Sequence, residues 1–70
     1  MAYTYTSVKD KITSLTIQPN EIEVTLKVHG TYKVKPISMR NTFDFLCKAE
    51  VGQTVRVATH SGQLQWIDRD

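Results

Sequence analysis

Strict alternation of apolar and polar residues constrains this chain more than any other feature. Ile22, Val24 and Leu26 occupy every second position of one segment, and charged or polar residues stand between them. Successive side chains of a strand point to opposite faces, so this pattern predicts a half-buried β-strand. The same alternation returns after Gly30 and twice more after residue 53. The sequence therefore predicts a mainly β protein.

The chain has 70 residues, one cysteine (Cys47) and two histidines (His29 and His60). A domain of this size buries only about 60% of the surface of its unfolded chain. One cysteine and two histidines provide neither a disulfide nor a tetrahedral zinc site. We therefore expect a single domain at 11–70, without metal or cofactor, preceded by an arm or edge strand at 1–10.

Composition also suggests where the protein works. A lone cysteine fits a reducing compartment, and the polar start of the chain has no signal-peptide pattern. No apolar run approaches the roughly 20 residues of a membrane-spanning helix. We expect a cytoplasmic protein that does not enter a membrane. The formal charge of +2, from nine Lys and Arg against seven Asp and Glu, is too small to identify a partner.

The first hairpin can be derived from the alternation. Paired residues of antiparallel strands share a face, so the connection must contain an odd number of residues. A three-residue loop at 28–30 pairs Leu26 with Tyr32 on the core face and sets Glu23 opposite Lys35. Its last residue, a glycine, suits the left-handed position of such a loop. A two-residue loop at 29–30 would pair core residues with solvent-facing residues. A three-residue loop at 29–31 would set Lys27 opposite Lys33.

The second hairpin follows from the same test. A four-residue loop at 59–62 pairs Val57 with Leu64 and Val55 with Trp66. This register points Trp66 into the core.

The segment before Pro19 has one residue out of phase between Ile12 and Leu15, which predicts a strand bent by a bulge. The only helical spacing follows Pro36. Ser38 or Asn41 is expected to cap this helix, and Gly52 to end it. Its apolar stripe contains Met39, Phe43, Leu46 and Cys47, and we expect the Cys47 thiol to be buried there.

The order strand, strand, strand, helix, strand, strand is that of the OB-fold, a small five-stranded barrel with its helix between the third and fourth strands. The segment 51–57 resembles the Gly-x-x-Val-x-Val entry to the fourth strand of such barrels. From Leu15 onward the chain resembles bacterial translation initiation factor one, although Gln53 stands where that family has an acidic residue. The matching positions are Pro19, Asn20, Gly30, Val34, Ile37, Ser38, Met39, Arg40, Asn41, Gly52, Val55, Val57 and Gly62. The resemblance implies an OB-like barrel and supports the fold more than a function.

A second resemblance concerns the histidine-containing phosphocarrier of the sugar phosphotransferase system. It is carried by 23–27, Gly30, Lys35-Pro36 and the helix from Met39. Lys33 stands where that family has its phosphorylated histidine, so the resemblance implies no phosphoryl relay.

We expect no enzyme, because acid–base or nucleophilic catalysis needs two groups within hydrogen-bond reach and no such pair is indicated. The leading hypothesis is binding of single-stranded RNA or DNA by the outer face of the second and third strands. Tyr3 and Tyr5 could add base stacking from the arm. The expected contacts are Lys27, Lys33, Lys35, Arg40 and Arg56.

The alternative is a protein-interaction or assembly subunit, including a homodimer. Ile37 and Ile67 fall out of phase with the core faces of their strands, and Phe45 lies off the helical stripe. Exposed apolar groups of this kind are typical of an interface.

Overall fold

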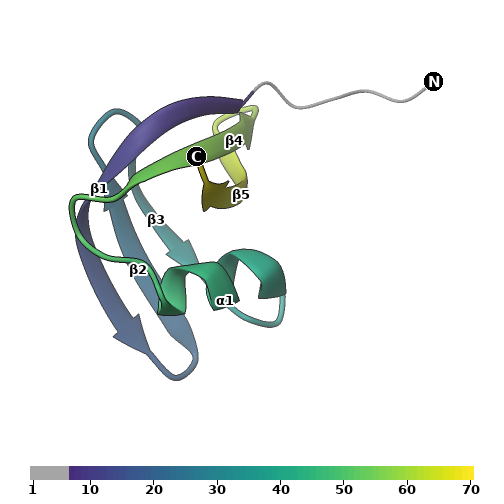
Figure 1. The fold of residues 1–70 in the computed structure, drawn as a ribbon. Helices are drawn as coiled ribbons and strands as arrows, with labels where there is room; N and C mark the ends of the chain where they lie inside the picture. The colour runs from purple at the N-terminus through teal and green to yellow at the C-terminus, as the bar shows by residue number, and fades with distance from the viewer. Residues whose placement is uncertain (1–6) are drawn as a thin grey trace.

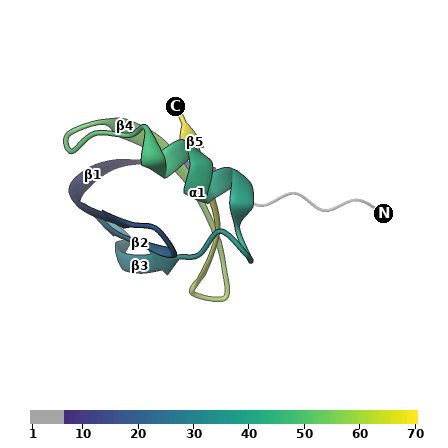
Figure 2. The ribbon, with the colours of Figure 1, turned by 90° about the horizontal axis from the view of Figure 1, so that it is seen from below.

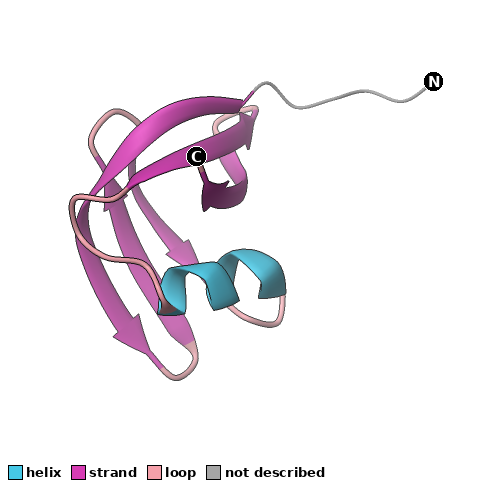
Figure 3. Cartoon of the chain, in the orientation of Figure 1, coloured by secondary structure: helices cyan, strands magenta, loops and turns pink. Residues whose placement is uncertain are grey.

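Five strands and one helix follow each other in the order predicted from the sequence (Figures 1 and 3). The computed structural model describes residues 7–70, so Tyr3 and Tyr5 lie outside the described residues. The elements are β1 (Ser7–Gln18), β2 (Glu21–Leu26), β3 (Gly30–Val34), α1 (Arg40–Cys47), β4 (Thr54–His60) and β5 (Gln63–Arg69).

A long bent strand joins the two halves of the sheet, whose order is β3-β2-β1-β4-β5. Residues 7–11 of β1 pair with β4, and residues 12–18 pair with β2. The register shifts between Ile12 and Ser14, which confirms the predicted bulge. Residues 7–10, expected in an arm or edge strand, therefore belong to the central strand, and the expected boundary at 10/11 falls inside it.

The sheet is curved but open (Figure 2). Within residues 7–70, β3 and β5 do not pair with each other, so the predicted barrel is not confirmed. The helix α1 packs against β5 and, less extensively, against β2. The buried hydroxyl of Thr42 on α1 accepts the backbone N–H of Ile67 at 3.2 Å. Because β5 is an edge strand, the helix satisfies a donor that a further strand would otherwise have to satisfy.

The concave side of the sheet and α1 enclose the core. Tyr32, predicted to point inward, is partly buried and packs against it. The buried apolar side chains are Ile12, Ile22, Val24, Leu26, Val34, Phe43, Leu46, Val55, Val57, Ala58 and Ile67.

The first hairpin has the predicted faces but not the predicted register. Val24 pairs with Tyr32 and Glu23 with Lys33, so the loop is 27–29. The shift of two residues keeps the paired side chains on their expected faces, but it moves Lys27 out of the strand and into the turn. The carboxylate of Asp10, on β1, binds the backbone of this turn and holds it in the observed register.

The second hairpin differs more from its predicted register than the first does. Ser61 and Gly62 form a two-residue turn with φ of 53° and 77°, the positive values of a type I′ turn. The register then shifts, because Thr59 pairs with Leu64 but Ala58 with Trp66. The extra residue reverses the phase of the rest of β5. The inward orientation expected for Trp66 was therefore wrong.

The helix also departs from expectation at both ends. It begins at Arg40 without a side-chain hydrogen bond at its N-cap, Met39, so neither expected cap operates. Its buried residues are Thr42, Phe43 and Leu46, and Cys47 at its end is exposed rather than buried. Gly52 does not end the helix. It adopts φ of 94° in the connection to β4 and donates its N–H to the Ile12 carbonyl at 2.7 Å.

Candidate nucleic-acid interface

Three lysines border one hollow where β1 meets the turn between β2 and β3. The hollow, of about 290 Å³, is lined by Lys9, Lys11 and Lys27 together with Asp10, Val28 and Thr54. Lys9 and Lys11 are two residues apart on a strand and share its outer face. The N–H of Lys27 donates to the Lys11 carbonyl at 2.9 Å, which brings the third lysine beside them. All three side chains belong to exposed residues.

The carboxylate of Asp10 holds this arrangement together. Its side chain has no exposed surface, and it accepts the backbone N–H groups of Val28 and His29, each at 3.0 Å. It also accepts the N–H of Lys11 at 2.7 Å and lies 2.5 Å from Nδ1 of the His29 ring. These bonds fix the turn against β1 and so fix the position of Lys27.

Two opposing effects act on the pKa of Asp10. Burial, the largest single effect, raises the pKa. The hydrogen bonds from the His29 ring and from the backbone of Lys11, Val28 and His29 together outweigh it and bring the pKa below the ordinary value of 3.8. The carboxylate is therefore ionised at neutral pH, with its hydrogen-bonding capacity directed at the turn.

The positive charge continues onto β4, where Arg56 pairs directly with Lys9. The Arg56 Nη1 group donates to the Ser7 carbonyl at 3.1 Å, which holds the guanidinium over β1. We call Lys9, Lys11, Lys27 and Arg56 the basic face. Two carboxylates of β5 and the residue after it lie beside this face: Asp68 stands directly opposite Arg56, and the oxygens of Asp70 lie 3.3 Å from Lys9 Nζ and 3.5 Å from Arg56 Nε.

The residues predicted to bind nucleic acid are divided by the structure. Lys27 and Arg56 belong to the basic face, and Lys33, Lys35 and Arg40 lie elsewhere. Lys33 stands directly opposite Glu23 on the outer face of β2 and β3. Lys35 lies beyond β3, in a hollow that it shares with Glu21, among others. Arg40 on α1 forms an ion pair with Asp44, at 3.3 Å.

Sequence reasoning missed Lys9 and Lys11. The pattern Lys-Asp-Lys at 9–11 puts two positive charges on one face of a strand, but that signal depends on knowing that residues 7–11 form a strand. The alternation there is weak, because the inward residue between the lysines is the aspartate.

The expected protein interface is also divided. Ile37 is 94% exposed, as an interface residue should be. Phe45 is partly buried and packs against the core. Ile67 is only 2% exposed, so its assignment to an exposed interface was wrong. The bulge in β5 is the cause, because it returns Ile67 to the core opposite Val57.

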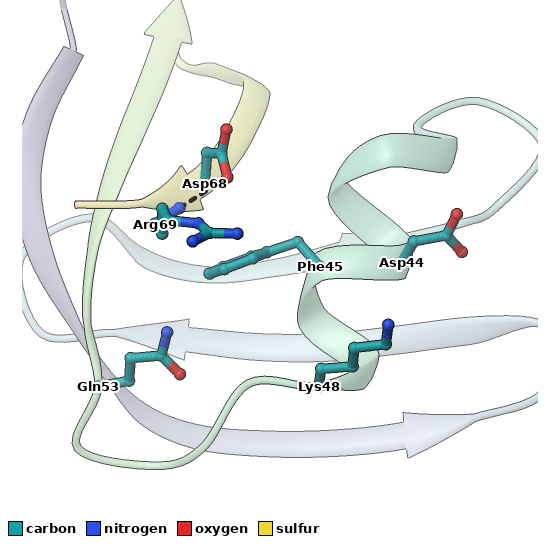
Figure 4. A pocket seen from close by; sticks show the side chains of 6 residues that line it. All are labelled: Asp44, Phe45, Lys48, Gln53, Asp68 and Arg69. Atoms are coloured by element: carbon teal, nitrogen blue, oxygen red, sulfur yellow. Dashed lines mark hydrogen bonds between the residues drawn. The ribbon is translucent and has the colours of Figure 1, made fainter.

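A second hollow, of about 510 Å³, lies between α1 and β5 (Figure 4). The Phe45 ring points towards Arg69, and Asp44 is directed away from the ring. Two acidic and two basic side chains line it, so it has no net charge to select a charged partner. Its lining residues are Asp44, Phe45, Lys48, Gln53, Asp68 and Arg69.

Among residues 7–70, no group of three or more His, Cys, Asp or Glu side chains is placed to hold a metal ion. The described part of the chain also contains no helix of the length and apolarity needed to span a membrane. No protein-family model matches the chain, and no curated protein or solved structure matches it. The candidate site therefore rests on its own geometry.

Proposed function

We propose that this protein is a non-enzymatic, OB-like module that binds single-stranded RNA or DNA through the basic face. The observation that carries the proposal is the convergence of Lys9, Lys11 and Lys27 on one hollow, continued by Arg56 on the neighbouring strand. Lysine and arginine side chains bind the phosphates of nucleic acids and release their condensed counterions. Lys33 on the outer face of β2 and β3 is matched by Glu23 and gives weaker support.

Two features of the fold support the OB-like part of the proposal. The strand order and the position of α1 between β3 and β4 are those expected of an OB-like protein. The bent central strand, shared between both halves of the sheet, gives the curvature that such a barrel requires. The resemblance to bacterial translation initiation factor one adds to this proposal of fold. We also propose that the protein acts in the cytoplasm.

The test is a binding titration with fluorescently labelled single-stranded oligonucleotides of mixed sequence at about 50 mM and about 200 mM salt. We expect affinity to fall steeply as salt rises. The variant with Lys9, Lys11 and Lys27 all changed to Gln removes three phosphate contacts, which should make the negative slope of log K against log salt shallower by about 2. The matched control changes Lys33, Lys35 and Arg40 to Gln.

Because both triple variants lose the same charge, a specific role of the basic face requires the first to lose much more affinity than the second. Equal losses would show that only net charge matters. Absence of binding by the wild-type protein at the lower salt would overturn the proposal.

A second candidate function, protein interaction, is favoured by the 94% exposure of Ile37. Ile37 borders a hollow of about 520 Å³ together with Pro36 and the turn after β1. Sedimentation of the wild-type protein and of Ile37→Ser tests self-association at this hollow. A dimer that the substitution dissociates supports this function, and a monomer at every concentration argues against self-association.

A further inference from the structure

The β5 bulge gives the basic face an aromatic neighbour. Trp66 pairs with Ala58, and Ala58 pairs with Ser7, so the three residues form one row across β5, β4 and β1. The next residue, Ile67, points into the core opposite Val57, which places the row of Trp66 on the outer face. Trp66 is the only large side chain of the row and is partly exposed, whereas Ala58 beside it is fully buried.

The adjacent row of the same face carries the cations. Arg56 lies two residues before Ala58 on β4 and pairs with Lys9 on β1 and with Asp68 on β5, so one carboxylate shares the row with the two cations. Arg56 is thus a diagonal neighbour of Trp66, and such neighbours lie about 7–8 Å apart, with their Cβ atoms somewhat closer. One nucleotide unit can cover this separation between its base and its phosphate.

A carboxylate already occupies the position of an anion between these cations. The two oxygens of Asp70 contact Lys9 and Arg56, whose side chains are 64% and 40% exposed. Exposed ion pairs are weak, so a competing anion can displace the carboxylate. A phosphate group is a good competitor, because it accepts charge-assisted hydrogen bonds from both arginine and lysine.

We propose that Trp66, Arg56 and Lys9 form a subsite for one nucleotide of the bound strand. The base stacks on the indole of Trp66, and the adjacent phosphate takes the place of Asp70 between Arg56 and Lys9. Asp70 then acts as a built-in competitor for phosphate. This inference rests on the proposed function and goes beyond it, because it requires the base as well as the phosphate to contribute to affinity.

The first test uses the wild-type protein and two probes, an oligothymidylate and an abasic oligomer with the same number of phosphates. Trp66 is the only tryptophan of the chain, so its fluorescence reports stacking directly. We expect the oligothymidylate to quench this fluorescence and to bind about 5- to 150-fold more tightly than the abasic probe, the equivalent of 1–3 kcal/mol for one stacked base.

The outcomes separate the two proposals. If neither probe binds at low salt, the proposed function fails and the subsite with it. If both bind equally and the fluorescence does not change, the proposed function stands and the subsite fails. The variant Trp66→Ala should abolish the preference for the oligothymidylate, and Trp66→Phe, which keeps an aromatic face, should restore most of it.

The second test addresses Asp70. Changing Asp70→Asn should raise the affinity for both probes by up to about fivefold, because it weakens the competitor. The matched control is Asp44→Asn, which makes the same change of charge on α1, where Asp44 pairs with Arg40. Equal effects of the two variants would show that only net charge had changed, and would overturn the assignment of the phosphate position.

Discussion

Removal of the Asp10 carboxylate should destabilise the protein strongly. In Asp10→Ala, the N–H groups of Val28 and His29 lose the charged acceptor that they reach at 3.0 Å. A hydrogen bond to a charged group contributes about 1.5–3 kcal/mol. Water can reach the turn once the carboxylate is gone, so we take the lower value for each bond and expect a loss of about 3 kcal/mol.

This loss is large for so small a protein. At about 0.05–0.15 kcal/mol per residue, a chain of this length has a total stability of roughly 4–10 kcal/mol. The melting temperature should therefore fall by about 12–24 °C. Asp10→Asn keeps one acceptor oxygen without the charge and should cost about half as much.

Thermal and urea unfolding, followed by circular dichroism, measure these losses. The control is Asp44→Ala, which removes an exposed carboxylate whose ion pair with Arg40 is worth at most about 0.5 kcal/mol. If Asp10→Ala were no more destabilising than this control, the account of the turn would be refuted.

Ionisation of the Asp10 carboxylate should also make the stability of the protein depend on pH. The pKa of Asp10 is lower in the folded protein than its ordinary value of 3.8, so the folded state favours the ionised form. The stabilisation is therefore complete above about pH 5 and is lost as the pH falls through 3.8 and then through the lower folded pKa. The stability difference between the wild type and Asp10→Asn should be constant near neutral pH and should shrink below pH 3.8. A difference that stays constant into strong acid would contradict the ionised, turn-binding carboxylate.

Four further substitutions test the corrected fold. Ile67→Ala should cost about 2–5 kcal/mol, as a core truncation does, whereas Ile37→Ala at a 94% exposed position should be nearly neutral; equal effects in urea unfolding would contradict the core position of Ile67. Cys47→Ser should change stability by less than about 0.5 kcal/mol, and the thiol should react with an alkylating reagent in the native protein at the rate of a free thiol; slow reaction would place it in the core after all. Ser61→Asn should stabilise the protein by about 0.5–1 kcal/mol, because asparagine tolerates the positive φ of 53° better than serine; a lower melting temperature would argue against the type I′ turn.

The order of elements was predictable because alternation records burial at every second position of a strand. Ile22, Val24 and Leu26 bury one face of β2, as their spacing requires. The bulge of β1 was predictable for the same reason, since the phase error between Ile12 and Leu15 is visible in the sequence.

The registers of the hairpins were less predictable. The parity of a strand fixes which residues share a face, but it does not distinguish registers that differ by two residues. The position of the first turn depends on Asp10, which is 18 residues away from Val28 in the sequence. No local pattern reports a contact of that range.

The second hairpin failed for a different reason. An extra residue in a bulge reverses the parity of everything beyond it, and Gln65 has no property that marks it as such a residue. That single insertion moved Trp66 to the outer face and Ile67 to the core.

The composition of the candidate site was only half predictable, with Lys27 and Arg56 foreseen and Lys9 and Lys11 missed.

The central claim is that single-stranded nucleic acid binds to the basic face, beside Trp66. Its most direct test is a two-dimensional NMR titration of the isotope-labelled protein with an oligothymidylate at low salt. We predict that the largest shifts occur at Lys9, Lys11, Lys27 and Arg56 and at the indole N–H of Trp66. Shifts confined to the outer face of β2 and β3, around Glu23 and Lys33, or no shifts at all, would contradict the claim.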